Sequence, residues 1–285
     1  MLEFLLAVGL IWIVLSIVQD FRTREVANWL NFSLIIFALA FRLFYSVFSS
    51  DYKFFIFGLF GLGVFLILGH LLYYSRLFAG GDAKLFIALG AIIPLADNFR
   101  DNNLIFIVFV FALLFGGAVY SLIYSFVIAF KNKKEFSRKY LNLYKENVRY
   151  FYSALAFSAS FIIYALISRE FYFFFIPFFL IGLFFLYVYA KAVEQSCMLK
   201  MVSVNTLRVG DWLEKEIRVK GKIIKPNWEG LSQEDVDLIK KSYKNKVLIK
   251  EGIPFTPAFL IAFLVILYIK FYLGGNFGLW GVFGF

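Results

Sequence analysis

Cysteine, histidine and charge are all scarce in this chain. It holds one cysteine, Cys197, one histidine, His70, and only 17% charged residues. A single cysteine excludes an internal disulfide bond and a thiolate metal cluster. Soluble domains carry about 25% charged residues, so the shortage of charge argues against that class. A cleavable signal peptide is not evident either, because Glu3 stands where such a signal carries basic residues.

Long apolar runs fill most of the sequence. Hydrophobic residues make up 62% of the 285 positions, and runs of near-span length are typical of membrane-spanning helices. A membrane barrel would instead show short alternating segments. The expected spans are residues 2–18, 29–48, 54–74, 83–96, 104–130, 151–167, 171–190 and 257–272. The sequence therefore predicts an all-α polytopic membrane protein with about six to eight transmembrane helices.

Lysine and arginine are distributed unevenly over the loops. The loops at 19–28, 75–84, 131–150 and 191–254 hold 24 of the 29 Lys and Arg residues. Because basic loops stay in the cytoplasm, we expect the N-terminus outside and these four loops inside. The net charge of +10 is then explained by the orientation of the spans rather than by nucleic-acid binding.

One stretch before the last span differs from the rest. "MVSVNTLRVGDWL" and "IRVKGKII" are typical of short strands, and "LSQEDVDLIKKSYKN" of an amphipathic helix with Ser232 as its N-cap. We expect a transmembrane helical domain at 1–195, a small cytoplasmic α+β domain at 196–254, and a C-terminal transmembrane helix and tail at 255–285. The α+β insertion is too small for a large core of its own.

Two aspartates lie at the cytoplasmic ends of expected spans. Asp20 ends the first span in "SIVQDFRTREVANWL", and Asp82 opens the fourth in "FAGGDAKLF". The run at 83–96 covers about 21 Å of a hydrocarbon core about 30 Å thick. Asp82 is therefore expected below the membrane surface, where an ionisable group is a functional candidate. The alternative is that Asp82 only caps its helix and that Asp20 is an interfacial residue.

A pair of carboxyl groups at this position suggests acid–base chemistry. Two neighbouring carboxyl groups do not both ionise easily, so one keeps a proton and polarises a carbonyl while the other takes a proton from water. That is aspartic peptide hydrolysis, which requires no metal and no cofactor. Gly80 and Gly81 would let backbone or substrate approach closely. The expected catalytic residues are Asp20 and Asp82, and the whole catalytic site falls within residues 1–195.

Other polar residues near these motifs are supporting candidates. Asn28 is expected to orient the loop after the first span. Lys84 is expected to point away from Asp82 and to reach the phosphates of the membrane surface. His70, toward the inner end of the third span, is expected to pack, with tuning of the acids as the alternative. Arg42, in the outer half of the second span, is expected to reach the interface.

Together the two motifs resemble the prepilin peptidases, a GxGD family of membrane aspartic peptidases, and in particular its archaeal preflagellin (prearchaellin) branch. In that family a first catalytic Asp precedes an Asp-x5-Ile-Pro-Asn pattern, which Asp20 and residues 26–28 match in part. The second catalytic Asp closes the GxGD motif and is followed by x-Lys-Leu, as Asp82 is here. Ala27 replaces the Pro of the first pattern, and Ala79 replaces the first Gly of the second.

The resemblance covers roughly residues 1–130 and implies a function. It implies an aspartic endopeptidase that removes the basic leader of archaellin or type IV pilin-like precursors at the cytoplasmic membrane face. Bacterial relatives that also methylate the new N-terminus carry paired Cys-x-x-Cys motifs, which this chain lacks, so cleavage without methylation is expected. The expected partners are these precursors and the lipid bilayer, with no nucleic acid.

Three alternatives stay open at this point. A presenilin-like or signal-peptide-peptidase-like protease also uses Gly-x-Gly-Asp, but it sets its first Asp after Tyr, whereas Gln19 precedes Asp20. An ion transporter would use two acids in a helical bundle, but it more often shows inverted repeats. A non-enzymatic platform for pilus or archaellum assembly would use residues 196–254 as its docking surface.

Overall fold

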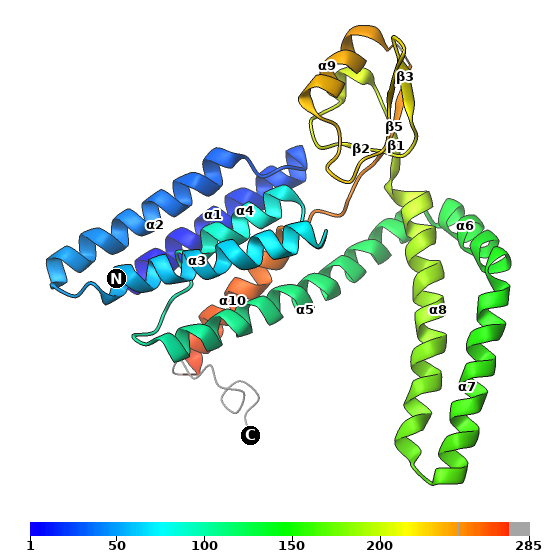
Figure 1. Ribbon diagram of the computed structural model, residues 1–285, viewed down its shortest axis with the longest axis horizontal. Helices are drawn as coiled ribbons and strands as arrows, with labels where there is room; N and C mark the ends of the chain where they lie inside the picture. The colour runs from blue at the N-terminus through cyan, green and yellow to red at the C-terminus, as the bar shows by residue number, and fades with distance from the viewer. Residues whose placement is uncertain (244, 274–285) are drawn as a thin grey trace. The chain divides into compact units, whose positions relative to one another are not determined.

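A computed structural model describes residues 1–243 and 245–273 of the chain, and it is mainly helical (Figure 1). The helices are α1 (Leu2–Thr23), α2 (Asn28–Ser49), α3 (Lys53–Tyr74), α4 (Gly80–Gly90), α5 (Phe99–Lys131), α6 (Lys133–Glu146), α7 (Val148–Ser168), α8 (Phe175–Val193), α9 (Gln233–Ser242) and α10 (Pro257–Tyr272). Short helical turns are η1 (Phe171–Phe174), η2 (Glu194–Met198) and η3 (Val204–Thr206). The strands are β1 (Leu199–Val202), β2 (Trp212–Leu213), β3 (Ile217–Val219), β4 (Lys222–Ile224) and β5 (Val247–Lys250). The expected tail at 274–285 lies outside the described residues.

Several of these helices fit a membrane. Among the described residues, six are long and apolar enough to cross it: α1, α2, α3, α5, α7 and the stretch Phe171–Met198 that contains α8. The chain is therefore a multi-pass membrane protein, as predicted. Helix α10 is apolar, but its 16 residues are fewer than the about 20 that a membrane span usually has.

Helix α4 is too short to span the membrane. It has 11 residues, which cover about 16 Å of a hydrocarbon core about 30 Å thick. The expectation of a span at 83–96 is wrong, because the helix ends at Gly90.

The backbone after α4 is irregular, and Arg42 compensates for it. The Arg42 side chain is 0% exposed. Its Nε donates to the carbonyl of Ala91 at 2.8 Å, and its Nη2 to those of Ile92 at 3.0 Å and Pro94 at 2.8 Å. Its Nη1 donates to the carbonyl of Phe54 at 2.9 Å. The expectation that Arg42 reaches the interface is wrong. Its guanidinium is buried and donates hydrogen bonds to carbonyl groups that have no helical partner after α4 ends.

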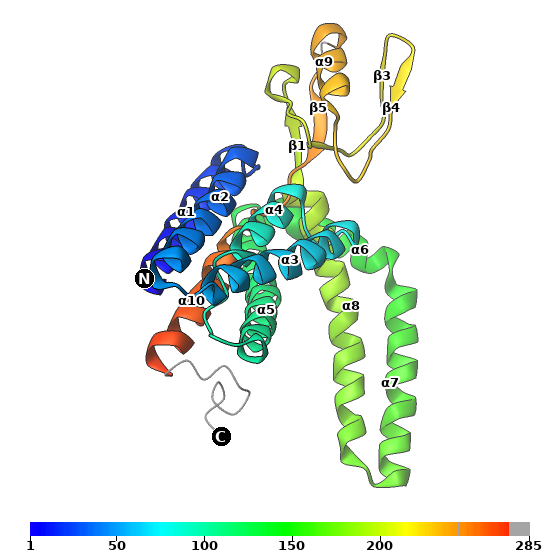
Figure 2. The same ribbon diagram turned by 60° about the vertical axis from the view of Figure 1, so that its left-hand side comes forward.

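Residues 1–122 and 254–273 belong to one compact unit. In it, α4 packs against α2 and α3, and α1 packs against α2 and α10. Figure 2 shows α10, in orange and red, between α1 and α5. Phe65 of α3 and Phe86 of α4 stack with ring centroids 4.5 Å apart, and both are fully buried. Helix α4 is thus held on several sides by apolar packing.

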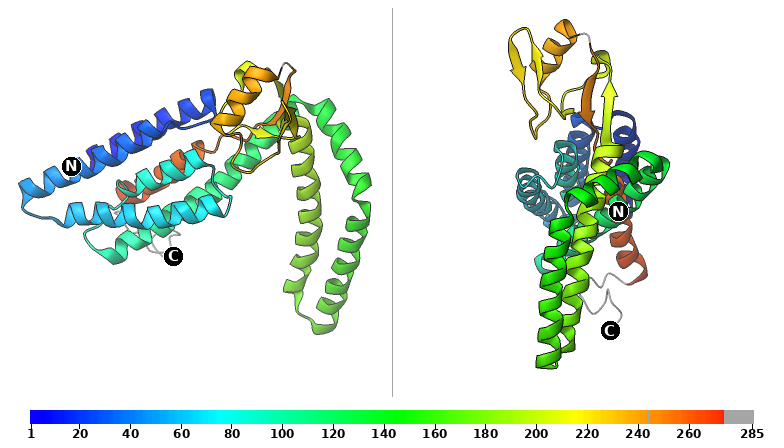
Figure 3. Two further views of the ribbon diagram at one scale, coloured as in Figure 1. Left: turned by 45° about the horizontal axis from the view of Figure 1, so that its top comes forward. Right: turned by 90° about the vertical axis from the view of Figure 1, so that its right-hand side faces the viewer.

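Residues 123–253 form the second unit. Helices α7 and α8 pack side by side as a hairpin (Figure 3), and the turn between them places Arg169 at φ 57°. The spans expected at 151–167 and 171–190 are thus joined by a short connection. Helix α6 was not expected; Leu143 on its apolar face packs against Phe184 and Val188 of α8.

A small mixed region precedes α10, as the sequence predicts. Strands β1, β5 and β2 form an antiparallel sheet in the order β1-β5-β2, and β3 pairs with β4. Ser232 is the N-cap of α9, since its Oγ accepts from the backbone N–H of Asp235 at 3.2 Å. The central strand β5 was not expected. The domain boundaries at 195 and 254 stay a prediction.

Candidate active site

Asp20 lies in the last turn of α1 and is only 7% exposed. Its carboxylate Oδ2 accepts a hydrogen bond from the hydroxyl of Thr256 at 2.9 Å and a longer one from the Thr256 N–H at 3.4 Å. Thr256 is 0% exposed and is the N-cap residue of α10. Asp20 is therefore a buried acid whose described hydrogen-bond donors come from the far end of the sequence.

Asp82 is the third residue of α4, and its side chain is half-buried. Its carboxyl group makes a backbone hydrogen-bond contact at Ala79 and interacts electrostatically with Asp20. The N-cap residue of α4 is Ala79, and an acid at the third helical position that bonds the N-cap backbone has the capping-box arrangement, so helix capping stays an alternative role for Asp82. Ala79 has extended backbone, with φ −71° and ψ 161°, which any residue adopts. Alanine can therefore occupy the position of the first glycine in the GxGD motif.

The two aspartate-bearing segments approach each other closely at Gly81. A Cβ added to Gly81 would lie 3.3 Å from the backbone nitrogen of Val26, which is in the connection between α1 and α2. A Cβ added to Gly80 would meet nothing nearer than Tyr73, at 3.8 Å. Of the two adjacent glycines, Gly81 is therefore the one that the close approach requires.

We expect Gly81→Ala to lower the rate of the reaction that the two acids support by about tenfold, since small displacements of reacting groups are costly. The new methyl group would push Val26 and the segment after Asp20 away from α4. Gly80→Ala is the matched control and should stay within about twofold, because it removes one glycine without a close contact. Activity assays on both purified variants measure the difference. Equal effects of the two substitutions would contradict the role given to Gly81.

Asn28 and Lys84 lie together at the surface of the first unit. The Lys84 ammonium donates to Oδ1 of Asn28 at 2.6 Å, and both side chains are exposed. Asn28 begins α2 and Lys84 lies in the first turns of α4. The bond therefore ties the starts of two helices that adjoin the aspartate segments. The sequence did not predict this pairing, because it treated the two residues separately.

His70 does not join the acids. It is exposed on α3, and its Nδ1 bonds the carbonyl of Leu66 in its own helix at 2.8 Å. Its described ring neighbour is Tyr74, with centroids 6.3 Å apart. A packing role within α3 explains these contacts, and no described contact links His70 to Asp20 or Asp82.

Thr256 is the site residue that sequence reasoning missed. Its signal is visible in "GIPFTPAF", where Thr precedes Pro at the start of an apolar run, a pattern typical of a helix N-terminus. This pattern predicts that Thr256 caps a helix. It does not predict the hydrogen bond to Asp20, because 236 positions separate the two residues in the sequence.

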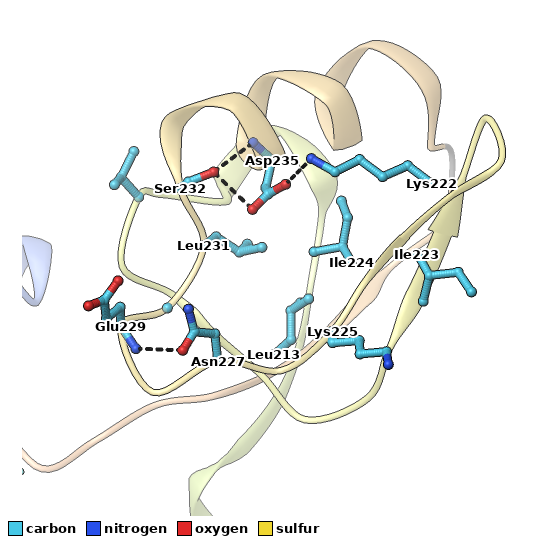
Figure 4. A pocket seen from close by; sticks show the side chains of 12 residues that line it. Leu213, Lys222, Ile223, Ile224, Lys225, Asn227, Glu229, Leu231, Ser232 and Asp235 are labelled. Atoms are coloured by element: carbon cyan, nitrogen blue, oxygen red, sulfur yellow. Dashed lines mark hydrogen bonds and ion pairs between the residues drawn. The ribbon is translucent and has the colours of Figure 1, made fainter.

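A second pair of acids, Asp211 and Glu251, interacts electrostatically in the small mixed region. Among residues 1–243 and 245–273, no group of three or more His, Cys, Asp or Glu side chains is placed to hold a metal ion. A pocket of about 430 Å³ lies in the small mixed region, between the β3–β4 hairpin and the start of α9. Figure 4 shows the Lys222 ammonium beside the Asp235 carboxylate there, at 2.9 Å. The pocket contains none of the predicted site residues.

Comparisons with known proteins match the N-terminal part of the chain to one family. Residues 7–130 match the model of the type IV leader peptidase family. A preflagellin peptidase of Methanococcus maripaludis is 33% identical over 94 residues, which is 33% of this chain and 40% of that protein. A preflagellin peptidase of Methanocaldococcus jannaschii is 32% identical over 87 residues, 30% of this chain and 37% of that protein. The chain thus aligns with about two-fifths of the length of these curated relatives. No solved structure matches it significantly. The resemblance predicted from the two motifs is confirmed over the matched stretch.

Proposed function

We propose that this chain, whose residues 7–130 match the type IV leader peptidase family, is a membrane aspartic endopeptidase. One observation carries the proposal. Asp20 in the last turn of α1 and Asp82 in the first turn of α4 belong to one compact unit, in which Gly81, next to Asp82, lies against Val26 of the connection that follows Asp20. Two neighbouring carboxyl groups can hydrolyse a peptide bond without a covalent intermediate, one as the acid and the other as the base.

The reaction follows from the pair. One carboxyl group is protonated and donates a hydrogen bond to the scissile carbonyl oxygen, which becomes more electrophilic. The other carboxylate takes a proton from a water molecule, whose oxygen attacks the carbonyl carbon. Collapse of the tetrahedral intermediate breaks the C–N bond, and the leaving nitrogen receives a proton from a carboxyl group. At the end of the cycle one carboxyl group is again protonated and the other is again a carboxylate, so a further reaction can begin.

The substrate class rests on the relatives and on the loop charges. The relatives are named preflagellin peptidases, so we propose archaellin or type IV pilin-like precursors as substrates. The basic loops favour a cytoplasmic position for both acids, the side on which a basic leader would be retained. Because the sequence lacks paired Cys-x-x-Cys motifs, the proposed reaction is cleavage without methylation.

Co-expression with a precursor tests this function. We expect membranes that contain this chain to shorten a prearchaellin or prepilin by its basic leader, seen as a size shift on a gel. N-terminal sequencing should then give an unmethylated residue at the junction with the apolar helix. Cutting should persist in excess chelator, since the proposed step uses only carboxyl groups and water. An uncut precursor, or loss of cutting on chelation, would contradict the proposed mechanism.

A further inference from the structure

The start of α10 contacts both aspartate-bearing segments. We define the 255–259 segment as Phe255 to Phe259, in the sequence Phe-Thr-Pro-Ala-Phe. Through Thr256 it donates two hydrogen bonds to the same oxygen of Asp20. This contact lies at the C-terminal end of the chain, beyond the matched stretch of residues 7–130.

The Thr256 hydroxyl is not used to cap its own helix. A threonine at an N-cap position normally accepts a hydrogen bond from the second or third residue of the helix. Here the first helical residue is Pro257, which has no N–H. The N–H of Ala258 donates to the carbonyl of Phe255 at 2.9 Å, and that of Phe259 to the carbonyl of Thr256 at 3.0 Å. The helix start is satisfied by backbone, so the hydroxyl is available for Asp20.

The flanking phenylalanines hold the segment that leads to Asp82. Phe255 and Phe259 both pack on Phe78, with ring centroids 5.5 Å and 6.0 Å apart. Phe78 is buried and precedes α4 by two residues. Gly117 of α5 leaves room for Phe255, since a Cβ there would lie 2.6 Å from its ring. The 255–259 segment therefore fixes the approach to α4 while it binds the acid on α1.

Both Thr256 bonds end on Oδ2 of Asp20. Within the described residues, Oδ1 of Asp20 makes no hydrogen bond, so it is the oxygen left for a water molecule or a substrate. Two donors on one oxygen of a buried carboxylate restrict its rotation about χ2. The arrangement presents the other oxygen in one orientation.

We propose that Thr256 is a positioning residue for the reaction, which holds the Asp20 carboxylate so that Oδ1 faces the reacting water. This inference rests on the proposed peptidase function. It makes α10 a third element of the site, beside α1 and α4. Thr256 acts through Asp20 and does not itself touch the scissile bond.

Kinetics of Thr256 variants test this role on the purified full-length protein with a prearchaellin substrate. We expect Thr256→Val, which keeps the shape but loses the hydroxyl, to lower kcat about 30-fold with KM within about twofold. Thr256→Ser restores the donor and should return kcat to within about threefold of wild type. Ser46→Ala is the matched control: it removes another buried hydroxyl, which accepts from the N–H of Phe55 at 3.1 Å, and should leave kcat within about twofold.

The outcomes separate this inference from the proposed function. If the wild type cleaves and Thr256→Val has an unchanged kcat, the positioning role is overturned. Loss of kcat in the Val and Ser variants alike, with matching drops in Tm, would show a purely structural role and overturn it as well. If Thr256→Val does not fold, Thr256→Ala removes the hydroxyl without adding volume. The kcat of Thr256→Ala is then compared with that of Thr256→Ser, and the same outcomes apply. Absence of cleavage by the wild type would instead contradict the peptidase function itself.

Discussion

Asp20→Asn and Asp82→Asn are each expected to lower the rate of leader cleavage by about 10³-fold, the range that a lost general acid or base costs. Asparagine has nearly the shape of aspartate but neither takes a proton from water nor carries the proton that polarises a carbonyl. The measurement is the initial rate of precursor shortening by equal amounts of membrane-inserted protein.

The matched control for these variants is Asp97→Asn. Asp97 is exposed in the connection that follows α4, so the same chemical change there should leave the rate within about twofold. Both site variants should remain in the membrane with wild-type abundance. A near wild-type rate in either one would show that the two-acid assignment is wrong.

Arg42→Met is expected to have the largest effect on stability. It removes the donors for three buried carbonyls, those of Ala91, Ile92 and Pro94, and for the partly buried carbonyl of Phe54. A buried polar group left without a partner costs about 1–3 kcal/mol, and partial relaxation would bring the loss to about 4 kcal/mol. For a chain of this size we expect Tm to fall by about 10 °C.

Thermal unfolding in detergent measures this effect. Arg100→Met is the matched control, because Arg100 is exposed in the first turn of α5, and its Tm should change by no more than about 2 °C. Arg42→Lys should fall between the two, since one ammonium does not reach all four carbonyls. An unchanged Tm in Arg42→Met would contradict the role of Arg42 in closing the end of α4.

The apolar spans were predictable because hydropathy depends on local composition. The end of α4 was not, since "AIIP" at residues 91–94 is as apolar as the helix before it. Its irregular backbone depends on Arg42, about 50 positions away in the sequence. Hydropathy measures the length of a run and does not show where another helix supplies donors to broken backbone.

Helix α6 was missed for a different reason. The loop at 131–150 was interpreted from its charge, and seven of its residues are Lys or Arg. Its apolar residues Phe136, Tyr140 and Leu143 recur at helical spacing and pack on or beside α8. The helical spacing of the apolar residues was present in the sequence. It was not recognised, because basic residues between the apolar positions led to the interpretation of the segment as a loop.

The candidate site also has parts that the sequence predicts and parts that it does not. The motifs around Asp20 and Asp82 are local and can be recognised from the sequence, although the span expected after Asp82 is wrong. Thr256 depends on a contact between the two ends of the chain, which no local pattern contains. Gly81 was suggested by the motif, but only the distance to Val26 distinguishes it from Gly80.

The central claim is that Asp20 and Asp82 act as one catalytic pair. Single-turnover cleavage by Asp20→Asn, Asp82→Asn and the double variant tests it most directly, because residues that act as a unit show non-additive losses. The account predicts that the double variant loses about the same 10³-fold as each single variant. Losses that multiply to about 10⁶-fold, or a single variant that cleaves at the wild-type rate, would contradict it.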